Sequence, residues 1–253
     1  MYKVIPVLSA MAEKPFPLNR AMYRYPKEGT VQYAFGFAVV ISDDDVILVD
    51  TGVYSDDEFQ SASSPIFKQL TGLLDNKPCL ESLKELGIDA EQVTKIILSH
   101  LHWDHSWNVD KFPNAKIYVQ KLELEGSVTP LPYERIHFGY WDGEYKLPNF
   151  LKVMDKMVAV DGDAEICPGI RVMLAPGHTR GGQIVFVDTK DGKVALLGDF
   201  ANLPQGVTED EGYPPSLLVN AEEWYKAFER LKKEKPDFLL TFHDINTYDR
   251  IYG

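Results

Sequence analysis

The chain has 253 residues, 45% of them hydrophobic and 25% charged, a composition that excludes a globally disordered protein and is ample for a buried core. Acidic residues number 38 against 26 Lys and Arg, and the resulting net charge of -12 makes nucleic acids and anionic membranes poor candidates for a partner. The apolar runs are too short for a transmembrane helix or a secretory signal. Cys79 and Cys167 form no disulfide or metal-binding pattern, so we expect a cytoplasmic protein with reduced thiols.

The first half of the chain is predicted to alternate strands with helices within a single domain, residues 1–253, because no Ser-, Gly- or Pro-rich linker divides it. β-branched and aromatic residues predict the strands, and apolar residues at helical spacing predict the helices. The acidic run 43–45 is a turn signal between the first two strands, and Gly87 suits the left-handed conformation that ends a helix. The strands are expected at residues 31–41, 46–49, 93–98 and 115–119, and the helices at residues 65–74, 80–86 and 122–125.

The second half shows the same alternation. Strands are expected at residues 170–174, 183–187 and 194–197, with Asp191-Gly192 as the hairpin turn between the last two. Residues 221–235 form an amphipathic helix, and residues 238–242 form the last strand. Clusters of strands that alternate with helices twice predict an α/β fold in which two sheets pack together with helices outside.

Three of the six histidines fall within the seven-residue segment SHLHWDH, residues 99–105. A lone histidine after a strand is more often structural, but three together point to a metal site. If the strand geometry persists, His100 and His102 point the same way, because side chains alternate along a strand. A turn at Trp103 would then bring Asp104 and His105 to the same place.

Three further ligand-type residues, His178, Asp199 and His243, each follow a predicted strand. Taken singly, Asp199 is simply explained as a turn residue and His243 as a surface histidine. Glycines beside His178 and Asp199 allow a close backbone approach to a site. An ordinary catalytic zinc site uses three protein ligands and one open position, so seven ligand-type residues predict two metal ions.

Five short motifs occur along the chain: Asp50-Thr51-Gly52, the HxHxDH run at 100–105, Pro176-Gly177-His178-Thr179, Leu197-Gly198-Asp199 and Phe242-His243-Asp244. They resemble those of the metallo-beta-lactamase superfamily, in order and at comparable spacing. Within it the chain is most similar to the N-acyl homoserine lactone lactonases, a likeness that includes Ser99, the stretch 114–120 and Lys235-Pro236.

The resemblance implies an αββα sandwich of two mixed sheets, with the site at the sheet edges. It also implies two divalent metal ions; imidazole donors favour zinc, while Fe, Mn or Co suit such a site too. Asp50 would lie behind the ligands, either orienting a ligand histidine or stabilising the Thr51-Gly52 turn. The implied ligands are His100, His102 and His178 for one ion, Asp104, His105 and His243 for the other, and Asp199 as the bridge.

The resemblance further implies a dinuclear metal-dependent hydrolase that opens a lactone ring, with N-acyl homoserine lactones as candidate substrates. A hydroxide held by the two metals would attack the carbonyl carbon. Asp104 and Asp199 are the candidates for carrying the proton to the leaving oxygen. The lactonases commonly have a tyrosine where this chain has Asn202, which can donate a hydrogen bond to the oxyanion but cannot supply a proton. Trp107-Asn108 likewise replaces the usual Gly-Gly.

Aromatic residues gather between the metal motifs and again near the N-terminus. The first set, with His137 inside it, is predicted to form a lid or an acyl-chain wall; loop packing or a homodimer contact is the alternative. Trp103 would line the substrate entrance or pack in the core. The second set would close over the pocket. The first set is Tyr133, Phe138, Tyr140, Trp141 and Tyr145, and the second is Phe16, Tyr23, Tyr25, Tyr33 and Phe35.

Two alternative functions remain open at this point. The same centre would serve a hydrolase that acts on a thioester or a phosphodiester, although the acidic charge disfavours RNA and DNA. A non-catalytic protein that binds a metal or a partner would be expected to have lost some ligands, and all seven are present. The superfamily hosts many chemistries on one site, so the fold alone does not settle the substrate.

Overall fold

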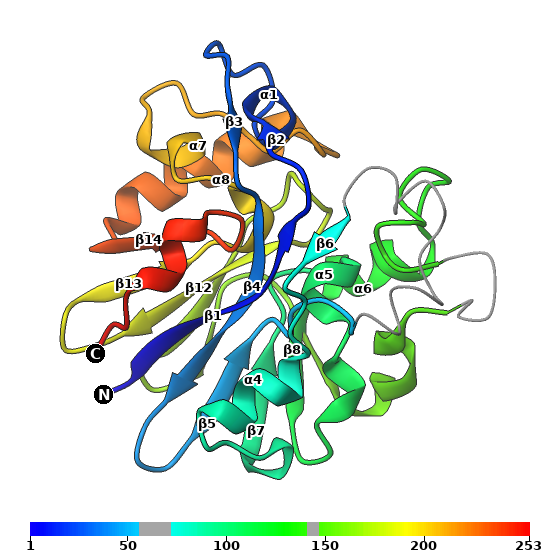
Figure 1. Cartoon of the computed structure of the whole chain (residues 1–253), viewed down its shortest axis with the longest axis vertical. Coiled ribbons are helices and arrows are strands. Elements are labelled where there is room, and N and C mark those ends of the chain that lie inside the picture. Colours follow the sequence, from blue (N-terminus) through cyan, green and yellow to red (C-terminus); the bar gives the residue numbers. More distant parts are fainter. Residues whose placement is uncertain (56–71, 141–146) are drawn as a thin grey trace.

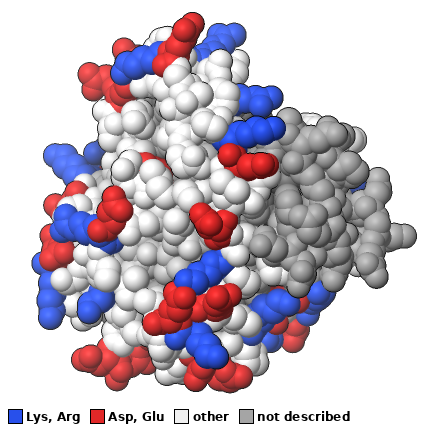
Figure 2. Space-filling model, viewed as in Figure 1, with Lys and Arg blue, Asp and Glu red and all other residues white. Residues whose placement is uncertain are grey.

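The computed structural model describes residues 1–55, 72–140 and 147–253, which form two large β-sheets packed face to face (Figure 1). Helices lie on the outer faces of both sheets. Among the described residues, no helix is long and apolar enough to cross a membrane. Lys and Arg are interspersed with Asp and Glu on the face shown in Figure 2.

The first sheet has seven strands in the order β6-β1-β4-β5-β7-β8-β9. Strands β1, β4 and β5 pair antiparallel, whereas β5, β7, β8 and β9 run parallel. Parallel strands end at the same edge of a sheet, so the segments after β5 and β7 emerge side by side. The strands are β1 (Lys3–Ala12), β4 (Ala34–Ile41), β5 (Val46–Val49), β6 (Leu73–Leu74), β7 (Val93–Ile97), β8 (Lys116–Gln120) and β9 (Met157–Val160).

The second sheet has five strands in the order β10-β11-β12-β13-β14, antiparallel except for the parallel pair β13 and β14. This parallel pair brings the segments after residues 196 and 240 to one edge. A separate two-stranded sheet joins β2 (Phe16–Pro17) to β3 (Thr30–Val31). The five strands are β10 (Ala164–Cys167), β11 (Ile170–Leu174), β12 (Gln183–Asp188), β13 (Lys193–Leu196) and β14 (Phe238–Leu240).

The space between the two large sheets is filled by β-branched and aliphatic side chains. Val40 and Val49 of the first sheet and Val185 and Leu196 of the second belong to one fully buried cluster. Burying such a side chain contributes about 1.5–3 kcal/mol, so this layer is a major source of stability. It also fixes the edges of the two sheets relative to each other, and the candidate site lies at that edge.

Two amphipathic helices cover the outer faces. Helix α4 (Cys79–Glu85) packs Leu83 against the first sheet, and α8 (Ala221–Glu234) packs Trp224 against the second. The side chain of Asn220 caps α8 by accepting a hydrogen bond from Glu223 N at 3.2 Å. The other helices are α1 (Leu18–Ala21), α5 (Trp103–Ser106), α6 (Lys121–Val128) and α7 (Gln205–Thr208), with 3-10 turns at Ala90–Gln92, Val109–Lys111, Asn149–Lys156, Gly198–Phe200 and Ile245–Asp249.

The predicted two-sheet α/β architecture is confirmed, and most predicted strands agree with the structure within a few residues. The predicted strand 31–41 is divided, because β3 ends at Val31 and β4 begins at Ala34. The predicted helix 65–74 falls mostly outside the described residues, and it is wrong at Leu73–Leu74, which pair with β1 as strand β6. Strand β1 itself was not predicted.

Candidate metal centre

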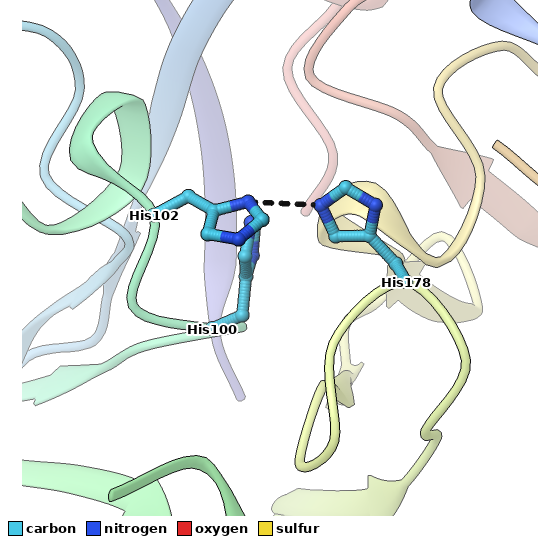
Figure 3. A group of neighbouring side chains, drawn as sticks. All are labelled: His100, His102 and His178. Carbon is cyan, nitrogen blue, oxygen red and sulfur yellow. Dashed lines mark hydrogen bonds between the residues drawn. The ribbon is translucent and has the colours of Figure 1, made fainter. Parts of the chain in front are cut away.

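Seven buried His and Asp side chains converge in two groups at the edge where the two sheets meet. The potential ligand atoms within each group all lie within 4.8 Å of one another. Figure 3 shows that His102 and His178 approach from different segments, with His102 Nδ1 3.0 Å from His178 Nε2. The first group is His100, His102 and His178, and the second group is Asp104, His105, Asp199 and His243.

The HxHxDH segment reaches this position through a loop and a helical turn. Strand β7 ends at Ile97, so the strand geometry does not persist to His102. The rings of His100 and His102 nevertheless lie 4.6 Å apart, centroid to centroid. Helix α5 begins at Trp103 and turns Asp104 and His105 toward the second group.

Asp199 lies between the two groups, with one carboxylate oxygen facing each. Its Oδ2 atom is 3.3 Å from His178 Nε2. Its Oδ1 atom is 3.1 Å from His105 Nε2 and 2.9 Å from His243 Nε2. Ligands about 2.1 Å from a zinc ion lie roughly 3–4 Å from one another, so this spacing fits a bridging carboxylate.

The remote nitrogens of three histidines are held by protein acceptors. The Nδ1 atom of His178 donates to Leu217 O at 2.8 Å, and that of His243 donates to Ala34 O at 2.7 Å. The Nδ1 atom of His105 lies 2.7 Å from Asp50 Oδ2. When Nδ1 carries the proton and donates a hydrogen bond, Nε2 of the neutral ring keeps its lone pair, and Nε2 faces the other members of the group.

Asp50 also organises the start of the histidine segment. Its two carboxylate oxygens accept hydrogen bonds from Ser99 N at 2.6 Å and Ser99 Oγ at 2.7 Å. The Ser99 hydroxyl in turn lies 3.0 Å from His100 Nδ1. Asp50 adopts a left-handed conformation, φ 63°, at the end of β5, which directs its side chain toward these partners. Asp50 therefore contacts the second group directly and the first group through Ser99.

Three buried atoms in the two groups make no hydrogen bond of good geometry with any described residue: His100 Nε2, His105 Nε2 and Asp199 Oδ1, of which the last two lie 3.1 Å apart. Buried polar atoms are nearly always hydrogen-bonded, so three such atoms at one place call for a common explanation. Imidazole and carboxylate are the donors that divalent transition metals prefer. The residues therefore fit a pair of divalent ions.

The electrostatics of the two groups differ. Burial lowers the pKa of His100 and of His102 well below the usual value, so both are neutral, the form that binds a metal. Burial also opposes protonation of His105, but the carboxylates of Asp104 and Asp199 raise its pKa well above the usual value. The second group thus concentrates negative charge that a divalent cation would neutralise.

A cavity of about 240 Å³ opens beside both groups. Three predicted substrate-contact residues, Trp103, His137 and Asn202, line it, and burial lowers the pKa of His137 to about 4. His137 is therefore a neutral imidazole at neutral pH. The remaining lining residues outside the two groups are Phe16, Arg20, Tyr33, Phe35 and Leu217.

The described aromatic residues of the 133–145 segment lie in different surroundings and do not form one wall. Phe138 is buried in the core and packs edge-on against His102, whereas Tyr133 is exposed. Tyr140 does not line the cavity, because it packs on the outer core cluster, where Arg135 lies 5.0 Å from its ring. Trp141 and Tyr145 lie outside the described residues.

Among the described residues, the aromatic side chains near the N-terminus line more of the cavity than those of the 133–145 segment. Phe16, Tyr33 and Phe35 line it, while Tyr23 and Tyr25 do not. The ring of Tyr33 stacks on that of His243, with centroids 4.2 Å apart. The N-terminal segment therefore forms part of the cavity wall, in agreement with the predicted closure over the pocket.

Asn202 is anchored by the protein itself. Its Nδ2 atom donates to Ala21 O at 3.0 Å, which ties α1 to the segment after Asp199. Arg20, on α1, was not predicted as a site residue, because it belongs to no motif and only the tertiary fold brings it to the cavity. Leu217 was missed for the same reason.

Comparisons with known proteins agree with this geometry. The family model of the metallo-beta-lactamase superfamily matches residues 33–243. An N-acyl homoserine lactonase from Bacillus thuringiensis is 32% identical over 167 residues, which are 64% of this chain but only 60% of that relative. One from Bacillus cereus is 30% identical over 210 residues, 79% of this chain and 76% of the relative.

The fold is shared with solved structures. The structure of an N-acyl homoserine lactone hydrolase with N-hexanoyl-L-homoserine bound matches with a TM-score of 0.73 and 23% identity, covering 96% of this chain and 94% of that one. The predicted αββα sandwich and the predicted likeness to the lactonase branch are confirmed. On the family match and the 30% identical relative, the chain belongs to the metallo-beta-lactamase superfamily.

Proposed function

We propose that the chain is a metal-dependent hydrolase that opens a lactone ring, with N-acyl homoserine lactones as its substrate class. The observation that carries this proposal is the pair of buried ligand groups beside an aromatic-lined cavity. The two Bacillus relatives are named N-acyl homoserine lactonases. The similar solved structure holds N-hexanoyl-L-homoserine at its catalytic metal centre.

Each group would hold one divalent ion, with Asp199 shared between them. The donor set favours zinc over Fe, Mn and Co, each of which also accepts imidazole and carboxylate ligands. When bound, the two ions supply an activated nucleophile near neutral pH and polarise the scissile carbonyl.

The residues of the chain orient the substrate and move the proton. Phe16, Tyr33 and Phe35 form an apolar wall that suits an acyl chain and excludes water from the reacting carbonyl. Asp104 and Asp199 line the cavity, where either carboxylate can accept the proton that the attacking water loses and pass it to the ring oxygen as the ring C–O bond breaks. Asn202 lines the cavity and donates one amide hydrogen to Ala21 O, and the second hydrogen of this amide would serve the substrate carbonyl.

A phosphodiester is the second candidate substrate, and Arg20 is the observation that favours it. Arg20 is the single Lys or Arg among the described residues that line the cavity. It makes no ion pair with any described residue. A guanidinium suits a phosphate or carboxylate oxygen pair, so Arg20 would favour a substrate with an anionic group. A thioester, the other alternative substrate, gains no such support.

Proton release by metal-reconstituted protein would test these proposals. The panel contains N-acyl homoserine lactones, simple γ- and δ-lactones, a thioester and an aryl phosphodiester, each with and without chelator. We expect chelator-sensitive ring opening of the acyl homoserine lactones. Activity confined to the phosphodiester would replace the lactonase assignment with the second candidate, and activity that persists in chelator would overturn the metal-dependent mechanism.

A further inference from the structure

Glu123 is a buried carboxylate close to the candidate site that belongs to neither ligand group. It lies on helix α6, directly after strand β8, and is 1% exposed. Its Oε1 atom accepts a hydrogen bond from Leu101 N at 3.0 Å. Its Oε2 atom accepts one from Gly181 N, also at 3.0 Å. One side chain therefore joins two segments that are 80 residues apart in the sequence.

Both donors belong to the segments that carry the first group. Leu101 stands between His100 and His102, and Gly181 follows His178 by three residues. The first segment leaves the seven-stranded sheet after β7, and the second connects β11 to β12 in the five-stranded sheet. The Glu123 carboxylate thus bridges the two sheets at the point where His102 and His178 meet.

The close packing at Gly181 leaves little room for the His178 segment to move relative to Glu123. A Cβ atom at Gly181 would lie 2.2 Å from Glu123 N, so the His178 segment rests directly on the start of α6. The neighbouring Arg180 pairs with Glu134 at 3.0 Å, and no described cation pairs with Glu123. The neighbouring Thr179 side chain and the two backbone N–H groups of Leu101 and Gly181 therefore oppose the cost of burying this carboxylate.

We propose that Glu123 is a positioning residue for the first group, holding the His100–His102 segment and the His178 segment at the separation that one metal ion requires. The inference rests on the proposed metal centre. Asp50 supports the second group directly through His105, and it reaches the first group only through Ser99. Glu123 would add a second buried carboxylate that acts on the first group alone.

The test is the metal content of Glu123→Gln at equilibrium with buffered zinc. The amide places a nitrogen where one oxygen accepts, so one of the two backbone hydrogen bonds is lost while size and shape are retained. Loss of such a supporting group weakens metal affinity by about 10–100-fold. We expect wild-type protein to bind two ions and Glu123→Gln to bind one of them about 10–100-fold more weakly, with the other unchanged.

Ser127→Ala is the matched control. Ser127 is buried on the same helix, but its hydroxyl donates within α6, to Leu124 O. It should retain two ions with wild-type affinity. Thermal unfolding of the metal-free proteins separates a general loss of stability from a specific loss of one site. If Glu123→Gln does not fold, Glu123→Asp gives the same test, because its shorter side chain cannot reach both N–H groups.

The outcomes separate this inference from the proposed function. Two ions bound by Glu123→Gln with wild-type affinity would overturn the role of Glu123 alone. Equal weakening of both ions in a folded Glu123→Gln protein would overturn a role confined to the first group. Wild-type protein that binds no ion would instead overturn the metal centre and with it the proposed function.

Discussion

The Oδ1 atom of Asp199 lies 2.9 Å from Nε2 of His243, while its other carboxylate oxygen faces the first group. Asp199→Ala removes the ligand-group side chain that lies between the two groups. We therefore expect loss of most bound metal and a fall in kcat of more than about 100-fold, beyond the 10–100-fold effect of a residue behind the ligands. Elemental analysis together with steady-state kinetics measures both.

The histidines allow a matched comparison. His102→Ala removes a member of the first group and should lose metal. His137→Ala alters a neighbouring imidazole, 5.4 Å from His102 between ring centroids, that belongs to neither group. It should keep wild-type metal content. Full metal content in His102→Ala, or metal loss in His137→Ala, would show that the ligand assignment is wrong.

Asn202→Tyr tests the position where the lactonases commonly carry tyrosine. The substitution removes the hydrogen bond to Ala21 O, which costs about 1 kcal/mol, and places a phenol hydroxyl at the cavity. We expect a change in the ratio of kcat/KM between lactones and the other panel substrates, with metal content unchanged. A change in metal content without a change in that ratio would contradict a substrate-side role.

Arg20→Leu distinguishes an anionic substrate from a neutral one. A hydrogen bond to a charged group contributes about 1.5–3 kcal/mol, so kcat/KM for a phosphodiester should fall by about 10–100-fold. The value for a neutral acyl homoserine lactone should change little, because it offers no anionic group. Arg24→Leu, four residues further along the chain and outside the cavity lining, controls for the change in net charge. Equal losses for both substrates would remove the case for anion recognition.

Asp45 allows a prediction of how the free energy of unfolding depends on pH. Burial raises its pKa, but hydrogen bonds from Lys95, at 2.5 Å, and Thr94 outweigh burial and lower the pKa below the usual value. Because the folded-state pKa is depressed, the stabilisation is complete above the unfolded-state pKa of about 4 and is lost as pH falls through the folded value. Asp45→Asn should therefore cost about 1 kcal/mol at pH 7 and progressively less in acid.

Denaturant unfolding of metal-free protein at several pH values measures this effect. Asp44→Asn, the adjacent change in the same turn, makes no ion pair with a described residue and should leave the free energy of unfolding nearly unchanged. A deficit of Asp45→Asn that persists unchanged far below pH 4 would exclude the ion pair as its origin.

The sequence predicts the central parts of this fold well because their signals are local. Strands such as β5 and β11 are short apolar runs between turn residues, and the HxHxDH motif concentrates four ligand-type residues in six positions. Strand β1 has no such signal, since its exposed, half-buried and buried residues follow no regular alternation. Leu73–Leu74 pair with it only because the tertiary fold brings them to its edge.

The order of the motifs predicts that the seven ligand-type residues come together, but it does not predict which other residues contact them. Arg20 and Glu123 belong to no motif, and each acquires its place only when distant segments pack together. The hydrogen bond between Asn202 and Ala21 likewise joins positions that are 181 residues apart. Such long-range pairs leave no trace in local composition or periodicity.

The small β2–β3 sheet stands apart from both large sheets, yet the segment around it brings Phe16 and Arg20 to the cavity. None of the seven residues of the two groups lies in this segment. Under the proposed function, variation in residues 16–30 would change which substrates the cavity admits while leaving the two ligand groups intact. Exchange of this segment between relatives would then transfer substrate preference without altering the ligand residues.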